Sequence, residues 1–255
     1  MKIVVLMKQV PDTWGDRKLD LQSGWVDRES GDLVIDEINE RAIEAALTVA
    51  ESNKGAEVVV MTMSPGDVSE SLKKALAMGC DAAVHIADAA LAGADSARTA
   101  AVLAAAIRAQ GADLVVAGNE STDGRGGVVP AMIAEHLGQP HLGMLGAIDV
   151  DGSTVSGTRR IDGGTQQVHA SLPAVISVNE SNPDARFPSF KGIMGAKKKP
   201  VSTISLADLD VALPAGSSTV LTTTVRPARA AGTVITDDGT AAEQLAEFLV
   251  SNRLV

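Results

Sequence analysis

The chain has 255 residues, 45% of them hydrophobic and 21% charged, which is enough length and apolar content for a large buried core. Its 22 Lys and Arg against 32 Asp and Glu give a formal charge of −10, which repels a phosphate backbone. With no Tyr, three Phe and two Trp, the chain also has few aromatic side chains on which bases could stack, so nucleic acid is a poor partner. One cysteine, Cys80, excludes an internal disulfide. No leader opens the sequence, and no apolar run approaches the roughly 20 residues that span a bilayer. We therefore expect a cytoplasmic protein without membrane insertion.

The first half of the sequence alternates short apolar runs with amphipathic stretches. Residues 3–7 indicate a buried strand, and after a polar excursion over 11–32 apolar side chains recur at helical spacing over 39–52. The same patterns predict further strands at 56–63, 82–86 and 113–117, and further helices at 69–78, 94–110 and 127–137. This alternation predicts an α/β fold with a Rossmann-like, doubly wound, mostly parallel sheet. Such a sheet is similar to that of adenine-nucleotide-hydrolase-like folds.

The pattern changes in the second half of the sequence. Turn sequences at Asp151-Gly152 and 161–164 between apolar runs predict added antiparallel strands, and 172–178 indicates a further strand. Residues 179–200 lack periodicity, as long functional loops do. We expect a domain over 1–200 that includes this loop, followed by an extended C-terminal arm over 201–255 with a short final helix at its end.

Loops that follow the predicted parallel strands are the candidate ligand site, because open α/β sheets bind ligands there. The loop from Gly118 to Gly127 follows a strand and opens a helix, so its backbone N–H groups can bind an anion, with Arg125 adding a charge. A glycine-rich connection without a ligand is the alternative. Lys8 can neutralise a phosphate or pair with an acidic neighbour, and Asn39 can cap the first long helix or face the same cleft.

The sequence lacks the patterns of hydrolytic and metal-dependent enzymes. Its four histidines show no metal-ligand spacing, no G-x-S-x-G motif is present, and no carboxylates are paired as general acid and base. We therefore predict no catalytic residue and no metal site, with a nucleotide hydrolase as the weakest alternative.

Residues 186–199 form the other unusual stretch. They join two of the three Phe residues to a run of Lys in an acidic protein. An exposed apolar tip with basic neighbours is typical of a partner-docking loop, and a loop folded on its own core is the alternative.

Six segments together resemble the β subunit of electron-transfer flavoprotein in its actinobacterial form, over essentially the whole chain. They are 5–12 (VLMKQVPD), 36–42 (DEINERA), 74–79 (KALAMG), 117–124 (AGNESTDG), 172–175 (LPAV) and 187–199. The resemblance implies an electron-carrier subunit, not an enzyme, in a heterodimer whose α subunit holds most of the contacts to FAD. It also implies that this subunit binds AMP structurally.

The resemblance places the cofactor contacts after the first, second and fourth strands. On this sequence they are Leu6, Lys8, Asp36, Glu37, Ile38, Asn39, Met63, Gly118, Asn119, Glu120, Ser121, Thr122, Asp123, Gly124, Arg125, Gly126, Gly127, Val128 and Val129. Some family members bifurcate electrons and bind a second FAD in place of AMP, with an Asp-Gly-Asp-Thr type of loop. Arg125 and the missing Thr favour AMP here.

The resemblance also implies partners. Electrons would pass from acyl-CoA dehydrogenases and related dehydrogenases of fatty acid oxidation, through the FAD, to a membrane quinone oxidoreductase. The implied docking residues are Arg186, Phe187, Phe190, Ile193 and Met194. The apolar anchor falls at Phe190, where a Leu is common, and the tail from Val201 is similar to the arm that embraces the α subunit.

Lysines in the docking stretch are methylated in some relatives, but one such position is Gly195 here, so we do not expect that regulation to transfer.

A rival of another class, a stand-alone adenine-nucleotide sensor of the universal-stress type, shares the sheet and the glycine-rich loop. That rival leaves the docking loop and the arm unexplained.

Overall fold

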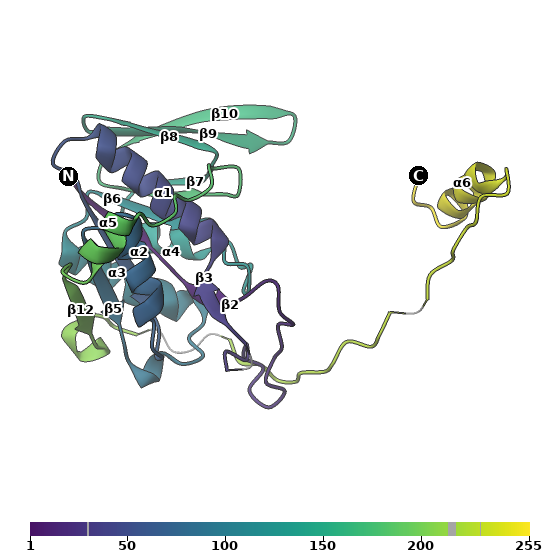
Figure 1. Cartoon of the computed structure of the whole chain (residues 1–255), viewed down its shortest axis with the longest axis horizontal. Coiled ribbons are helices and arrows are strands. Elements are labelled where there is room, and N and C mark those ends of the chain that lie inside the picture. The colour runs from purple at the N-terminus through teal and green to yellow at the C-terminus, as the bar shows by residue number, and fades with distance from the viewer. Residues whose placement is uncertain (30, 214–217, 230) are drawn as a thin grey trace. The chain divides into compact units, whose positions relative to one another are not determined.

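The computed structural model describes residues 1–29, 31–213, 218–229 and 231–255 (Figure 1). The chain forms two units, which divide between Thr222 and Thr223. The larger unit is an α/β domain, and the described residues of the smaller unit contain one helix. None of the helices in these described parts combines the length and apolar character needed to cross a bilayer.

The larger unit is built on a seven-stranded sheet whose neighbouring strands are all parallel. In spatial order the strands are β12 (Val201–Ile204), β5 (Ala82–Ile86), β4 (Glu57–Met63), β1 (Lys2–Leu6), β6 (Leu114–Gly118), β11 (Ala174–Val178) and β7 (His141–Leu145). Ile3, Val4 and Val5 are all wholly buried, because helices cover both faces of the sheet. The expected doubly wound parallel sheet is confirmed.

Alternate residues of each strand pack into two hydrophobic clusters. Ile3 and Val5 face α1 (Glu37–Ser52) and α2 (Ser69–Met78), whereas Val4 and Leu6 face α3 (Ser96–Gln110) and α4 (Val129–Leu137). Both α3 and α4 end at a glycine in the left-handed conformation, Gly111 and Gly138. These helices match the expected ones to within two residues at each end.

The antiparallel strands form a sheet of their own. It consists of β8 (Ala147–Asp151), β9 (Thr154–Ile161) and β10 (Gly164–Ser171), joined at the two expected turns, where Gly152 and Gly163 have φ of 57° and 84°. Val150 and Val155 are buried in the cluster that contains α1, so this sheet extends the core beside that helix (Figure 1).

Residues 179–204 are more regular than the sequence predicts. They contain α5 (Phe190–Ala196) and the edge strand β12, whose four residues pair with β5. A short 3-10 helix, η2 (Leu206–Asp208), follows β12. Of the expected arm, residues 214–217 and 230 lie outside the described residues.

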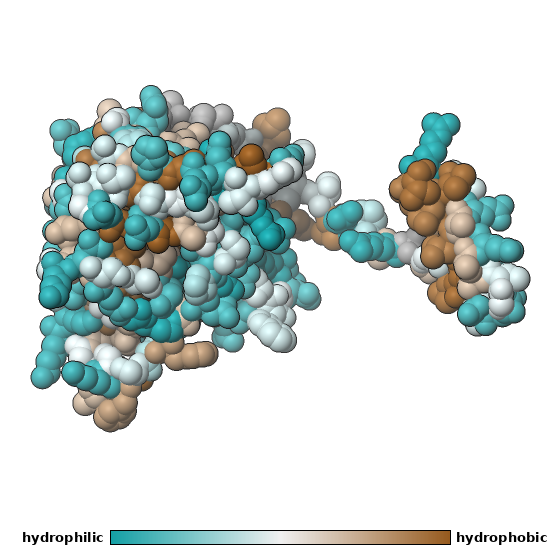
Figure 2. Space-filling view, turned by 90° about the horizontal axis from the view of Figure 1, so that it is seen from above, coloured by the Kyte–Doolittle hydropathy of each residue, from teal (hydrophilic) through white to brown (hydrophobic). Residues whose placement is uncertain are grey.

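The smaller unit contains α6 (Ala241–Ser251), which agrees with the helix expected at 240–251. Its apolar side chains gather on one side of this unit (Figure 2). Leu245, Phe248 and Val250 are all exposed, together with Leu254 just beyond the helix.

Candidate functional site

The order of the central strands reverses at β1. From β1 the chain adds β4 and then β5 on one side, and afterwards crosses to β6 on the other side. The loops that follow β1 and β6 therefore flank a switch point, where open α/β sheets bind their ligands. The first loop contains Lys8 and a small antiparallel pair, β2 (Gln9–Pro11) and β3 (Leu33–Ile35), and the second is residues 119–128.

A wholly buried carboxylate joins α1 to the loop after β6. Asp36 is the N-cap of α1 and accepts a hydrogen bond from the Ile38 N–H at 3.0 Å. The same carboxylate accepts from the backbone N–H of Thr122 at 2.6 Å and from its hydroxyl at 2.7 Å. Asp36 thus satisfies the first turn of the helix and fixes the glycine-rich loop against it.

The prediction that Asn39 caps the helix is wrong, because α1 already begins at Glu37 behind the Asp36 cap. Asn39 instead accepts a hydrogen bond at its Oδ1 from the Lys8 backbone N–H, 2.6 Å away. A methyl group at Gly118 would lie 2.4 Å from the Asn39 Nδ2 and 3.1 Å from a methyl of Ile38. Glycine at the end of β6 is therefore what lets α1 approach so closely.

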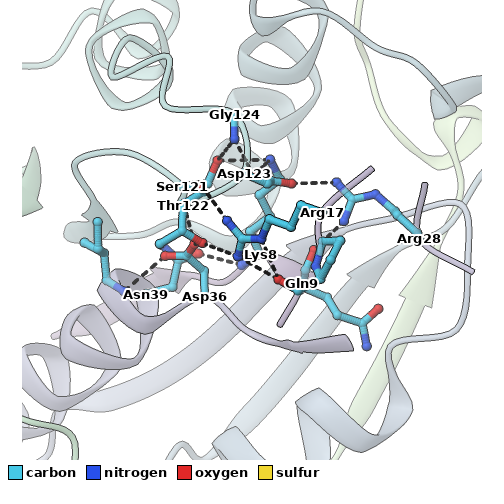
Figure 3. Close-up of polar contacts among 12 residues, drawn as sticks. Lys8, Gln9, Arg17, Arg28, Asp36, Asn39, Ser121, Thr122, Asp123 and Gly124 are labelled. Atoms are coloured by element: carbon cyan, nitrogen blue, oxygen red, sulfur yellow. Dashed lines mark hydrogen bonds and ion pairs between the residues drawn. The ribbon is translucent and has the colours of Figure 1, made fainter. Parts of the chain in front are cut away.

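Asp123 lies between two cations in the same network (Figure 3). The Lys8 ammonium donates to its Oδ1 at 2.7 Å and to the Ser121 hydroxyl at 3.0 Å, while an Arg28 nitrogen lies 2.9 Å from its Oδ2. Burial alone would raise the pKa of Asp123, whose side chain is 2% exposed, but the Lys8 hydrogen bond and both charges lower it to about 2. Of the two alternatives for Lys8, the structure shows the ion pair.

Sequence reasoning missed Arg17 and Arg28, which tie the excursion over 11–32 to this loop. Arg17 donates to the Thr122 carbonyl at 2.6 Å and to its hydroxyl at 2.8 Å. Arg28 also donates to the Gln9 carbonyl at 2.8 Å. Two arginines in a polar excursion of an acidic chain were the available signal, but no spacing rule says which loop they reach.

The remainder of the loop exposes backbone. Residues 124–128 are exposed, Arg125 and Gly127 have positive φ of 48° and 65°, and α4 begins after Val128 without a side-chain cap. The Oδ1 of Asn119 is buried without a hydrogen-bond partner. This loop therefore offers donors and an acceptor that fit a nucleotide. The donors are the N–H groups at the start of α4 and the exposed glycine backbone before it, and the acceptor is the amide oxygen of Asn119.

The other expected contacts lie on both sides of this loop. Leu6 belongs to the hydrophobic cluster of α3 and α4, and Met63 and Val129 pack against the same cluster. Glu37 is exposed at the start of α1. The Glu120 carboxylate lies close to Gly127, since one of its oxygens is 3.9 Å from the position that a Cβ atom on this glycine would take. The structure thus provides an apolar side and a polar side at one edge of the sheet.

The expected docking residues divide into two kinds. Phe187 and Phe190 are 95% and 81% exposed, and Ile193 and Met194 are about half exposed, on or just before α5. Arg186 instead turns its guanidinium onto Glu44 and Glu51 of α1.

The fold and the site define a doubly wound, Rossmann-like α/β protein, and residues 24–209 match the model of the electron transfer flavoprotein domain. An electron transfer flavoprotein subunit beta of Mycobacterium bovis is 47% identical over 99% of both chains, and that of Mycobacterium leprae is 48% identical over 99% of both. A caffeyl-CoA reductase-Etf complex subunit CarD of Acetobacterium woodii is 34% identical over 98% of this chain and 97% of its own. The chain belongs to the electron transfer flavoprotein β-subunit family, which confirms the resemblance and makes it an electron-carrier subunit.

Substituting Asp123→Asn tests the ion-pair network, because it removes the charge and keeps the size of the side chain. The pKa of Asp123 is about 2 in the folded protein against an ordinary 3.8, so its ionised form contributes stability that is complete above about pH 4 and is lost as the pH falls towards 2. We expect the variant to lose about 1 to 2 kcal/mol of unfolding free energy at pH 7, and the difference to shrink below about pH 4. Denaturant titrations at several pH values measure both.

The matched control is Asp162→Asn, in the exposed turn between β9 and β10, which should leave the unfolding free energy unchanged. A loss at Asp123→Asn that stayed constant from pH 7 to pH 2 would contradict the role of its charge.

Proposed function

We propose that this chain is the β subunit of a heterodimeric electron transfer flavoprotein that binds AMP at the switch point and helps to hold the FAD of the α subunit. It docks acyl-CoA and related dehydrogenases in the cytoplasm, so that their electrons pass through the FAD to a membrane quinone oxidoreductase. The observation that carries the proposal is the meeting of Lys8, Asp36, Asn39 and residues 121–124 at the switch point of a chain from this family. When bound, the flavin supplies the redox chemistry, and this subunit positions and docks.

The charges around the loop favour a nucleotide with one phosphate. Lys8 and Arg28 are both paired with Asp123, so they hold the loop in shape. The N–H groups of Gly124 and Arg125 already donate within the loop, to the side chains of Ser121 and Asp123 and to the Ser121 carbonyl. The exposed backbone of 126–128 and the Arg125 side chain remain to bind an anion. Those donors suit one phosphate group better than the higher charge of a triphosphate. Leu6 and Met63 offer apolar contacts for the base, beside the start of α1 at 36–39.

The nucleotide is identified by denaturing the purified chain and separating what it releases by chromatography. We expect AMP in a near-stoichiometric amount, because hydrogen bonds from Thr122 to the buried Asp36 hold the loop in a fixed position beside α1 before the nucleotide binds. The purified heterodimer should release one FAD in addition.

Other outcomes separate the alternatives. FAD from the chain alone would indicate a second flavin in place of AMP, and ATP would favour the universal-stress type of sensor. Either result would overturn the AMP assignment.

The smaller unit supports an α-subunit partner. We propose that 223–255 embraces the α subunit through the apolar side of α6, since Leu245 and Phe248, three residues apart on one face of this helix, are exposed and available for a partner. Co-expression with an α-subunit homologue should give a stable heterodimer that carries FAD, and a chain ending at Thr222 should give much less of it. Size-exclusion chromatography and the flavin absorbance measure both.

A full-length chain that formed no FAD-bearing complex with the homologue would count against the proposed subunit role. Equal yields from the full-length and shortened chains would reject the role of the smaller unit only.

Phe190 tests the docking surface. Phe190→Ala removes an apolar side chain that is 81% exposed, so it should raise the apparent KM of the dehydrogenase for the flavoprotein by about tenfold, as loss of an aromatic anchor does. The FAD content should not change. Phe190→Leu keeps an apolar anchor and should retain most of the transfer rate, and unaltered transfer by Phe190→Ala would reject the anchor role.

A further inference from the structure

In the segment over 182–200, two charged side chains turn inwards while its largest apolar side chains face outwards. Arg186 and Lys199 contact α1 and α2, whereas Phe187, Phe190 and Met194 are exposed, as are the other charged residues of the segment. A segment that folded only for its own stability would bury the aromatic rings and expose the charges. The inward charges therefore hold the outward rings in place.

At the N-terminal end the segment is fixed to α1. The backbone N–H and the Nε of Arg186 donate to one oxygen of Glu44 at 2.9 and 2.8 Å, and an Nη donates to its other oxygen at 2.9 Å. Arg186 also pairs with Glu51, about two turns further along the helix. Hydrogen bonds from Arg186 lower the pKa of both glutamates, so the pairs stay ionised at neutral pH.

At the C-terminal end the segment is fixed to α2. The Lys199 ammonium donates to the carbonyl oxygens of Leu76, Gly79 and Cys80, at 2.9, 3.2 and 2.6 Å. These are carbonyls at the end of α2 that have no further turn of helix to bond to them. A cation at this end of a helix also interacts favourably with its dipole.

Between the two ends, α5 lies directly against the backbone of α2. A methyl group at Gly192 would lie 2.2 Å from the Ala77 carbonyl oxygen, whereas one at Gly195 would meet no atom within 4 Å. With seven residues, of which Ala196 is the one buried, α5 is too short to be stable by itself. Its position therefore depends on the close contact at Gly192 and on the two charged attachments.

We propose that Arg186, Gly192 and Lys199 are positioning residues that hold the apolar face of α5 in a fixed orientation for a partner dehydrogenase. The inference rests on the proposed docking function of this segment. Because α5 is ordered before the partner arrives, binding does not have to fix its backbone and its large side chains. These residues set the affinity of docking without touching the partner.

Two glycine substitutions in the same short helix test the inference in the purified, FAD-loaded heterodimer. Gly192→Ala should raise the apparent KM of a partner dehydrogenase for the flavoprotein about tenfold, with an unchanged kcat at saturation. Hydrogen exchange of 190–196 should become faster, and the FAD content should stay the same. Gly195→Ala adds the same methyl group into open space and should change the KM less than about twofold.

Lys199 provides a second, independent pair of variants. Lys199→Met removes the donor and the charge and should raise the KM as Gly192→Ala does, and Lys199→Arg keeps both and should restore most of the affinity. A residue that only stabilises the fold is not expected to raise the KM while leaving kcat unchanged, nor to have its effect reversed by the Arg variant.

The outcomes distinguish this inference from the docking proposal. If Phe190→Ala raises the KM but Gly192→Ala and Lys199→Met do not, the docking surface stands and the positioning role is wrong. If none of the three raises the KM, the docking proposal itself fails and the inference fails with it. Loss of FAD or of the heterodimer in Gly192→Ala would also overturn the inference, because the glycine would then support the whole fold.

Discussion

The buried carboxylate of Asp36 is the interaction on which the candidate site depends. Asp36 is wholly buried and accepts three hydrogen bonds, one from the first turn of α1 and two from Thr122. A buried carboxylate without such donors would be strongly destabilising, so the loop after β6 has to come to the start of α1. Asn39 and Gly118 then bring Lys8 and the end of β6 into the same contact. Segments more than 80 residues apart in the sequence are held together by these groups.

Two acidic residues at a proposed anion site have a physical explanation. Asp123 takes up the charges of Lys8 and Arg28, and the result is a loop of fixed shape. Such a loop binds an anion through backbone N–H groups, whose directions are set by the fold, more than through net positive charge. This suits a nucleotide held permanently as part of the structure, because shape complementarity and hydrogen bonds then determine which nucleotide fits.

The sequence predicted those parts of the fold whose signal is local. Buried β-branched strands such as 3–7 and the helices between them have a clear periodicity, and the glycine-rich loop after β6 was recognisable by its composition. The edge strand β12 exposes most of its side chains and has no such pattern, and α5 is one short helix held by distant charges. Asp36 was missed as the cap in favour of Asn39, although its capping bond to Ile38 is local, because both residue types cap helices and lie close together. Arg17 and Arg28 were missed because long-range hydrogen bonds leave no trace in spacing.

Helix α1 connects the two proposed surfaces of the subunit. Its first turn carries the network of Asp36 and Asn39, and its later turns hold the docking segment through Glu44 and Glu51 on Arg186. Arg41, between them, pairs with Asp184 at 2.5 Å. Under the proposed function, a nucleotide bound beside 36–39 stabilises the same helix on which the docking segment rests. A subunit that does no chemistry would then have a physical reason to keep a nucleotide, since the nucleotide would help to fix the surface that receives the dehydrogenase.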